Sequence, residues 1–213
     1  MFGRFSAFFC LTLMVCSPSH SEDYFLISSG QTSFDGSEKI LGRYGITEVN
    51  GLQVDDSANG IGFAFGRELS NGKVFEIAYR ETGQMSISAP VGATFTRGEN
   101  DVKTITDHSE LKASAYSLGV AGLLPIFGNE RMDISARISV DYFEAEIEAI
   151  YGTKTLGGLK HGDAEGFALN YGLQASFGLT EELFFKVQYD LYGFDVMDDY
   201  QLETVSLGFG SEF

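Results

Sequence analysis

The feature that most constrains the fold of this chain is an alternation of large apolar residues with small or polar ones. Between residues 131 and 142, Met, Ile, Ala, Ile, Val and Tyr occupy every second position, and Arg, Asp and Ser lie between them. A period of two places the two sets of side chains on opposite faces of a β-strand. A helix would repeat its apolar residues at intervals of three and four. The pattern therefore predicts a strand with one apolar face.

The same alternation recurs along the chain and predicts an all-β protein. Seven stretches show it clearly, at about residues 60–66, 74–80, 115–121, 131–142, 167–178, 183–192 and 204–213. The 26 glycines, many of them at alternate positions in these stretches, also disfavour helices. A stretch at about 24–34 alternates more weakly and is the least secure element.

The residues on the non-apolar face distinguish a soluble protein from a membrane protein. A soluble β-sandwich buries its apolar face and exposes a face rich in Lys, Glu and Thr. Here the non-apolar positions hold mainly Gly, Ala and Ser with a few charges. Small residues fit the interior of a narrow barrel, and large apolar residues fit a surface that meets lipid chains. The composition favours a transmembrane barrel, and a soluble periplasmic sandwich is the alternative.

The expected connections between strands alternate strictly in length. Short ones lie near residues 70–72, 127–130 and 180–182, and longer ones lie at 35–57, 86–107, 148–165 and 195–199. Tight periplasmic turns and longer external loops are typical of outer-membrane barrels, which also take an even number of strands. We therefore count the stretch at 24–34 and predict an eight-stranded antiparallel up-and-down transmembrane β-barrel with both termini in the periplasm.

Residues 1–21 have the pattern of a secretory signal peptide. Arg4 gives a positively charged n-region, and residues 5–16 form an apolar run of 12 residues. This run is shorter than the roughly 20 residues of a membrane-spanning helix. Small residues before position 22 predict cleavage after Ser21, which makes residues 22–213 the mature barrel domain. Lipoprotein processing at Cys16 is the alternative.

The charge and cysteine content after this cleavage exclude two kinds of protein. Residues 22–213 contain 13 Lys and Arg against 30 Asp and Glu, a formal net charge of −17. Such an acidic chain lacks the basic surface that nucleic acid requires, so no nucleic-acid partner is expected. Both cysteines lie in the signal segment. The mature chain therefore forms no disulfide and depends on backbone pairing and packing.

The final strand, residues 205–213, alternates apolar residues and ends in Phe213. With the signal segment and the eight-strand pattern, the chain resembles small Gram-negative outer-membrane β-barrel proteins, such as the OmpA transmembrane domain, OmpX and the opacity-type adhesins. This resemblance covers about residues 22–213. It implies an outer-membrane location among outer-membrane lipids, and recognition by the barrel-assembly machinery through Phe213 and Phe209. The chain has no Trp, so the interfacial girdle is expected to consist of Tyr and Phe.

The strand phases place charges of both signs inside the barrel. Eight strands leave an interior that side chains fill, and buried charges are tolerated only in pairs. We therefore predict a polar network that plugs the lumen. In this network Arg80 and Arg137 would each reach an acidic partner, which is Glu76, Asp133 or Asp190. A thin ion path is the alternative. The expected network consists of Glu76, Arg80, Asp133, Arg137, Asp141, Lys186 and Asp190.

The remaining histidines give little support to catalysis. Some eight-stranded outer-membrane barrels modify lipid A, which the resemblance would link to a His beside a Ser. His108 adjoins Ser109, but neighbours on a strand point to opposite faces. His161 lies in a Gly-rich stretch. No catalytic residue and no cofactor are predicted, and a lipid A-modifying enzyme is the second alternative.

No metal site is predicted either. Residues 55–60 partly fit the start of a calcium loop, but Gly66 stands where that loop needs a bidentate Glu. Asp195, Asp198 and Asp199 are interpreted as a solvated acidic loop, with weak binding of a divalent cation as the alternative.

These observations favour a structural or surface-interaction role, similar to that of an adhesin. The barrel would be an anchor, and the long loops at 35–57, 86–107 and 148–165 would contact a host or surface ligand. Their acidic character favours basic partner surfaces. A narrow, porin-like channel is the first alternative.

Overall fold

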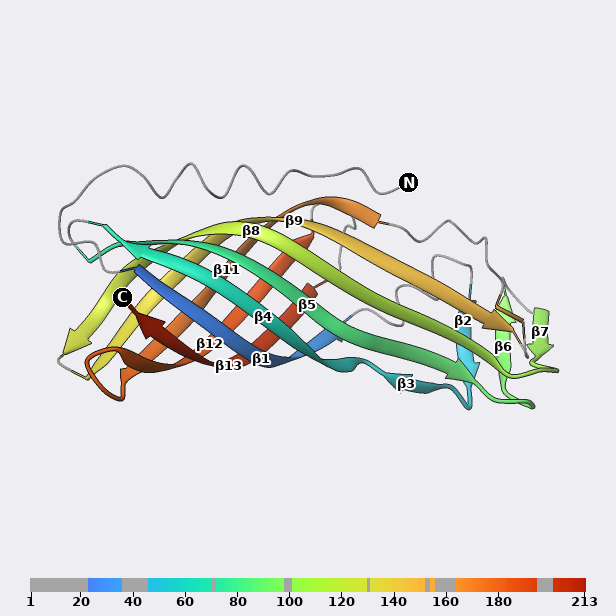
Figure 1. Ribbon diagram of the computed structural model, residues 1–213. Helices are drawn as coiled ribbons and strands as arrows, with labels where there is room; N and C mark the ends of the chain where they lie inside the picture. The colour runs from blue at the N-terminus through green and yellow to red at the C-terminus, as the bar shows by residue number, and fades with distance from the viewer. Residues whose placement is uncertain are drawn as a thin grey trace.

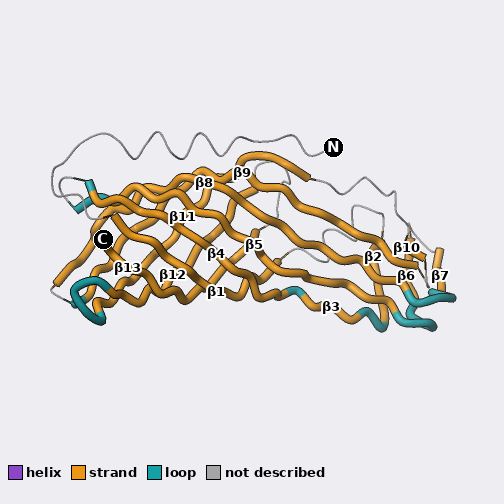
Figure 2. Tube along the Cα trace, viewed as in Figure 1, coloured by secondary structure: helices purple, strands orange, loops and turns teal. Residues whose placement is uncertain are grey.

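The computed structural model describes residues 23–35, 46–69, 72–97, 101–129, 131–151, 154–155, 164–194 and 201–213. The predicted signal segment, the cleavage site at Ser21 and the Gly-rich stretch around His161 lie outside the described residues. Every described element is a β-strand (Figures 1 and 2). No helix long and apolar enough to cross a membrane occurs in the described part of the chain.

Eight strands close into a barrel. Each pairs antiparallel with the next, and the last strand pairs with the first from Tyr24↔Glu212 to Asp35↔Gln201. This ring confirms the predicted fold class, and it confirms the weakly alternating first strand. The barrel strands are β1 (Asp23–Asp35), β4 (Ser57–Glu68), β5 (Val74–Ala89), β8 (Ser109–Asn129), β9 (Met132–Tyr151), β11 (Ala164–Gly178), β12 (Leu183–Phe194) and β13 (Gln201–Glu212).

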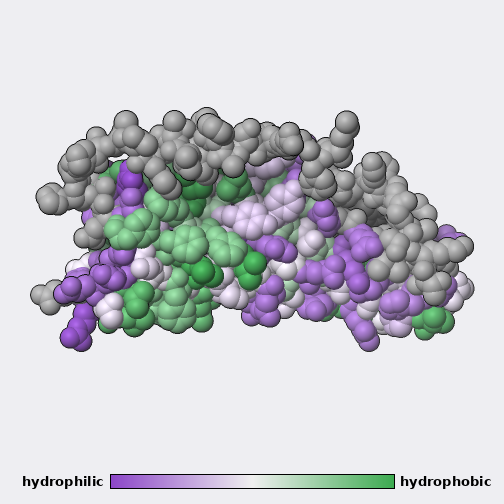
Figure 3. Space-filling model, in the orientation of Figure 1, coloured by the Kyte–Doolittle hydropathy of each residue, from purple (hydrophilic) through white to green (hydrophobic). Residues whose placement is uncertain are grey.

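The large apolar side chains of the barrel point outward. Phe63, Ile138 and Leu169 are 39%, 51% and 60% exposed, although a soluble sandwich would bury them. Figure 3 shows apolar residues gathered over the part of the visible face nearer the C-terminus, and hydrophilic residues over the opposite part. The inward positions hold mainly Gly, Ala, Ser and the charged residues, with a few large side chains such as Tyr24, Leu123 and Phe184. The barrel is therefore built for a lipid surround, which rules out the soluble alternative.

The short connections lie at one end of the barrel, together with the C-terminus, and we call this the proximal end (Figure 1). Between β8 and β9, the Asn129 side chain accepts hydrogen bonds from the backbone N–H groups of Arg131 and Met132, at 2.9 and 3.0 Å. Between β11 and β12, the hydroxyl of Thr180 accepts from the N–H of Leu183 at 3.0 Å. Side-chain acceptors of this kind hold a tight turn without further residues.

The connections at the other, distal end are not the plain loops that we predicted. β5, β8 and β9 contain 16, 21 and 20 residues, whereas a tilted membrane strand needs about 9–11. Their distal ends continue as a sheet that includes β3 (Gln53–Asp55) beside β5 and β10 (Lys154–Thr155) beside β9. A separate sheet joins β2 (Ile46–Asn50), β6 (Thr94–Arg97) and β7 (Asp101–Thr104). The intervals 35–57, 86–107 and 148–165 therefore contain paired strands.

We define the distal extension as β3, β10 and residues 84–89 of β5, 109–115 of β8 and 143–151 of β9. Its polarity is opposite to that of the membrane part. On β9, Ile138 and Val140 face outward, but beyond them the outward positions are held by Glu144, Glu146 and Glu148. The side that continues the lumen carries apolar residues: Met85, Ile87, Leu111, Ala113 and Phe143. The sequence prediction ended the strands where this reversal occurs, because the apolar residues no longer occupy the alternate positions that they hold in the membrane part.

A β-bulge produces the reversal on β5. Glu81 pairs with Tyr116 and Gln84 pairs with Ser114, so Thr82 and Gly83 together oppose Ala115. Gly83 has a φ of 74°, a conformation that disfavours other residues. The hydroxyl of Thr82 bonds to both the N–H and the carbonyl of Ala115, at 3.0 and 3.1 Å. The extra residue turns Met85 and Ile87 to the lumen side.

Candidate functional site

The lumen of the barrel is the candidate site, because it gathers charged side chains that the fold buries. Strands β1, β4 and β13 line it mainly with small residues, apart from Tyr24 and Leu26 of β1 and Leu202 of β13. Strands β5, β9 and β12 supply the charges. Alternation along each strand brings these charges to the inward face at successive levels of the barrel. The network consists of three cations and three anions, all buried except Arg80, which is half-buried: Arg80, Arg137, Lys186, Glu76, Asp141 and Asp190.

Arg137 lies at the centre of this network. Its side chain is 0% exposed, and its guanidinium lies 3.2 Å from Asp190 and 3.5 Å from Glu76. It also donates a hydrogen bond of 3.0 Å to the hydroxyl of Ser139. Asp190 in turn accepts a hydrogen bond from the amide of Gln188. One cation is therefore shared by two buried carboxylates, an arrangement that offsets the loss of hydration of each charge.

The proximal side of the network is sealed by aromatic rings. The ammonium of Lys186 lies 3.5 Å from Glu76 and 3.1 Å from the hydroxyl of Tyr24, which donates to Glu76 at 2.7 Å. The rings of Tyr24 and Phe184 meet edge to face with centroids 5.4 Å apart. These rings belong to a buried apolar cluster that also contains Leu26, Ala64 and Ala78. Ions moving along the barrel axis would meet this dry layer as well as the charges.

Arg80 forms the distal layer of the network. Its Nη1 donates to the hydroxyl of Tyr192 at 2.6 Å and lies 3.3 Å from Asp190 and 4.0 Å from Asp141. Asp141 also accepts a hydrogen bond of 2.7 Å from the amide nitrogen of Asn170. Arg80 and Arg137 share Asp190, so the two layers form one connected network.

The structure brings together six of the seven residues that the sequence analysis placed in the lumen network. Asp133 is the exception: its side chain is exposed, and no ion pair within the described chain joins it to either arginine. It is the second residue of β9, beside the proximal turn, where water can still reach the inward face. Tyr24 and Tyr192 were missing from the prediction, although Tyr192 shares its parity with Lys186 and Asp190.

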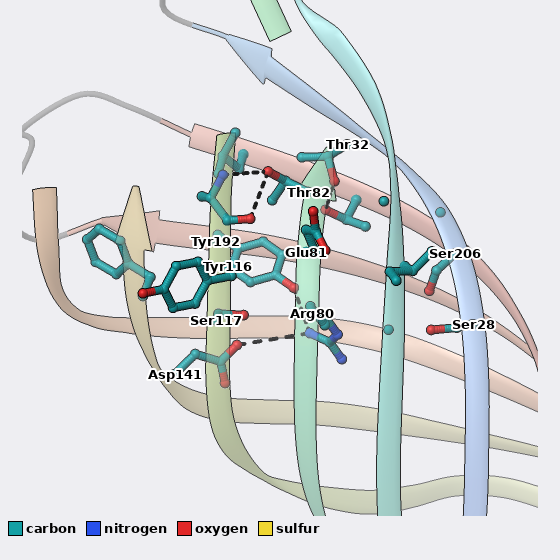
Figure 4. Close-up of a pocket in the computed structure, with 18 of the residues that line it drawn as sticks. Ser28, Thr32, Arg80, Glu81, Thr82, Tyr116, Ser117, Asp141, Tyr192 and Ser206 are labelled. Atoms are coloured by element: carbon teal, nitrogen blue, oxygen red, sulfur yellow. Dashed lines mark hydrogen bonds and ion pairs between the residues drawn. The ribbon is translucent and has the colours of Figure 1, made fainter. Parts of the chain in front are cut away.

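Above Arg80, on the distal side, the lumen opens into a cavity that we call the vestibule (Figure 4). Its volume is about 610 Å³ when the space continuous with solvent is included. Arg80 and Asp141 form its floor, and Phe143 and Tyr192 bound it on one side. The other side is open because β1, β4 and β13 present mainly small residues there, with Ile61 and Leu202 as the larger ones. The small residues are Ser28, Gly30, Thr32, Gly60, Gly62, Thr204 and Ser206.

The outward face carries tyrosine–glutamate pairs where the apolar band ends. The hydroxyl of Tyr116 donates to Glu144, and the hydroxyl of Tyr142 donates to Glu165 at 2.9 Å. Tyrosine places an apolar ring toward lipid and a polar tip toward water. The pairs thus mark the boundary between the membrane part and the distal extension. The sequence analysis expected a tyrosine girdle but did not anticipate its carboxylate partners.

The remaining predicted residues stand apart from the lumen. Phe209 packs its ring against Phe185 with centroids 5.3 Å apart on the outer surface. The N–H of Phe213 donates to the carbonyl of Asp23 at 2.9 Å, which ties the last residue to β1. Their role in barrel assembly stays a prediction.

Those catalytic and metal candidates that the structure describes form no site. The hydroxyl of Ser109 donates to the carbonyl of Asp107 at 3.2 Å, and His108 is exposed. No group of three or more His, Cys, Asp or Glu suited to a metal occurs among the described residues. Asp195, Asp198 and Asp199 lie outside the described residues.

Known structures share this fold, whereas no family model matches the sequence and no curated protein does. Ail, the attachment invasion locus protein of Yersinia pestis, is 15% identical, with a TM-score of 0.53 over 91% of this chain and 99% of that chain. Neisserial surface protein A is 12% identical, with a TM-score of 0.51 over 90% and 97% of the two chains. At these identities the likeness concerns the fold. The chain has the fold of small outer-membrane β-barrels.

Proposed function

We propose that this protein is an outer-membrane anchor whose lumen is closed to ions and whose distal extension contacts partners outside the cell. The observation that carries the proposal is the connected six-charge network, backed by the aromatic layer of Tyr24 and Phe184. An open channel needs a continuous aqueous path. Here three cations and three anions interact with one another across the lumen and fill it. With the lumen closed, the parts that remain to act are the surfaces beyond the membrane.

The outward apolar band and the short connections at the proximal end support the proposed location and orientation. The outward apolar band would lie in the outer membrane among its lipids, with the proximal end in the periplasm. Residues 1–21 would serve as the export signal, removed after Ser21. The barrel-assembly machinery would recognise the final strand through Phe209 and Phe213. The distal extension would then be displayed on the cell surface.

The charge of the distal extension defines the class of partner. Glu146 and Glu148 are exposed on its outward face, in line with Glu144. Lys112, opposite Glu148, is already paired with Glu110 at 3.6 Å. The structure of Ail in complex with the heparin analogue sucrose octasulfate shows that a barrel of this fold can bind a polyanion. Residues 22–213 of this chain carry a net charge of −17, so we propose a basic protein surface as its partner.

Conductance of planar bilayers tests the closed lumen. The folded mature chain should give no sustained current at moderate voltage. The variant Tyr24→Ala/Phe184→Ala removes the aromatic layer and should raise conductance, which shows that the assay detects this barrel. A steady, ohmic current from the wild-type chain would instead support the narrow channel.

Cell adhesion tests the partner. Cells that display the chain should adhere to poly-lysine surfaces more than to heparin-coated ones. Glu146→Gln/Glu148→Gln should reduce adhesion to poly-lysine by several fold. The matched control, Glu181→Gln/Glu182→Gln, changes two exposed carboxylates at the proximal turn and should leave adhesion unchanged. An equal loss in both variants would refute the role of the distal extension.

A further inference from the structure

The vestibule combines a confined space with polar groups that form no hydrogen bond within the described chain. Its enclosed part has room for about three water molecules. Ligand sites of barrel proteins commonly lie in the barrel mouth. Figure 4 shows Ser28 and Ser206 on neighbouring strands, with their hydroxyls on the same side as Arg80.

Several hydrogen-bonding groups of the vestibule have no partner within the described chain. The hydroxyls of Ser28, Ser117 and Ser206 line the cavity without a hydrogen bond to any described residue. The guanidinium of Arg80 uses its Nη1 for Tyr192 and Asp190, and its Nε and Nη2 form no hydrogen bond within the described chain. By contrast, Thr32 and Thr204 bond to each other at 3.0 Å, and Thr82 bonds to Ala115. In the strand order of the barrel, these free hydroxyls lie on both sides of Arg80, with Ser28 on β1 and Ser206 on β13 to one side and Ser117 on β8 to the other.

The surrounding charges select against ionic ligands. The lining carries charges of both signs, so a cation meets Arg80 and an anion meets the carboxylates of Asp141 and Glu81. An anion would have to pass the acidic distal extension and would lie near Asp141 and Asp190, which already share the arginine. A neutral molecule meets neither penalty, and hydroxyl groups can both donate to and accept from serines and accept from Arg80. The ring of Tyr192 and the side chain of Phe143 supply apolar contact on the opposite wall.

We propose that the vestibule binds one edge of a small, uncharged, hydroxyl-bearing molecule such as a single sugar ring, with the rest of the ring in the part that is open to solvent. Arg80 and the hydroxyls of Ser28, Ser117 and Ser206 bind its polar edge, and Tyr192 packs against its less polar face. The site is separate from the surface that we propose for basic partners, so either proposal can fail without the other.

The test is a titration of the mature chain, folded in phospholipid nanodiscs free of sugar-based detergent, followed by NMR. The probe is glucose at concentrations up to about 0.1 M, well above a millimolar Kd. The amides of Ser28, Ser117 and Ser206 and the Nε–H of Arg80 should shift together in a saturable manner. Glucose 6-phosphate and glucosamine carry an added charge on the same ring and should bind at least several fold more weakly.

Two matched variants locate the site. Ser28→Val/Ser206→Val removes two hydroxyls and narrows the vestibule, and should weaken glucose binding by about tenfold or more. Ser176→Val changes an inward serine of β11 that does not line the vestibule, and should leave the affinity unchanged.

Two results would overturn the proposal, and the wild-type spectra provide both even if a variant fails to fold. The first is the absence of localised shifts in the wild-type chain up to the highest glucose concentration, which would leave the vestibule a water-filled cavity. The second is equal or tighter binding of glucose 6-phosphate, which would show that the ligand class is anionic.

Discussion

The membrane part of the barrel and the distal extension are made from the same strands but have opposite polarity. On β8, Leu118 and Val120 face outward and are about half exposed, whereas Leu111 and Ala113 of the same strand face the lumen side. The outward face of β9 changes over the same distance from Ile138 and Val140 to a row of glutamates. Which face of a strand is apolar is therefore set by the surrounding medium. In the membrane part the apolar side chains face outward toward lipid, and in the distal extension they face inward, away from water.

The two regions also differ in how they hold charge. In the membrane part, charges lie inside and are shared among several partners, as Asp190 is between Arg80 and Arg137. In the distal extension, charges lie outside in water, as in the pair of Lys112 with Glu110. Buried charges without partners are costly, whereas exposed pairs contribute little. Substitutions in the two regions should therefore have very different effects.

Removal of the central cation should have the largest effect. Arg137→Leu leaves Glu76 and Asp190 without their shared partner and should lower the free energy of unfolding by about 3–5 kcal/mol. Lys112→Leu, its counterpart in the distal extension, should change it by less than about 1 kcal/mol. Urea unfolding of both variants in lipid vesicles measures the difference. Similar values for the two would contradict the buried network.

A charge placed on the outward face should distinguish the two regions next most strongly. Leu118→Lys puts an ammonium against lipid and should destabilise the barrel by about 2–4 kcal/mol. Ser114→Lys, on the same face of the same strand but in the distal extension, should have an effect of about 0–1 kcal/mol. The same unfolding measurement applies. A large penalty at Ser114 would place the membrane boundary further along the strand.

The bulge that reverses the polarity of β5 should be sensitive to a single methyl group. Gly83→Ala adds a Cβ at a positive φ, 2.2 Å from the carbonyl oxygen of Asn59, and should cost about 1–3 kcal/mol. Gly92→Ala has a similar φ of 92° but open space around the new Cβ, so its effect should be smaller. Hydrogen exchange of the amides of residues 84–89 should accelerate in the first variant and less in the second. Unchanged exchange in both would show that the bulge does not hold the extension.

The tyrosine–glutamate pairs at the boundary should have the smallest effect. A double-mutant cycle of Tyr116→Phe and Glu144→Gln should give a coupling energy of about 0.5–1 kcal/mol. The pair links the apolar band to the acidic face, and its energy is reduced by exposure to water. A coupling near zero would mean that the two regions meet without a specific contact there.

Much of the barrel could be predicted because local sequence carries its signal. The alternation in β9 and β11 indicates strand type and face, and the short turns indicate antiparallel order. The distal strands were missed for a definite reason. At residue 143 of β9 the apolar positions change parity, and an analysis that expects one phase per strand treats the change as the end of the strand.

The sequence predicted most residues of the lumen network but not the contacts among them. The parity of Arg80, Arg137 and Lys186 is sufficient to place them inside the barrel. The same parity placed Asp133 with them, and only its position at the proximal end of β9 explains why it stays exposed. The vestibule depends on the small side chains of β1, β4 and β13 lying at the level of Arg80. This alignment of four strands is not contained in the sequence of any one of them.

The sequence by itself determined that this chain forms amphipathic strands with large apolar residues on one side, because side-chain alternation is a local property of each strand. It also determined the charge balance of the lumen and the acidic character of the rest. Only the tertiary structure decided which charges share a partner, which face of each distal strand turns toward the lumen side, and where the lumen remains open. These properties depend on the register and closure of eight strands, and register is a relation between distant segments rather than a property of any one of them.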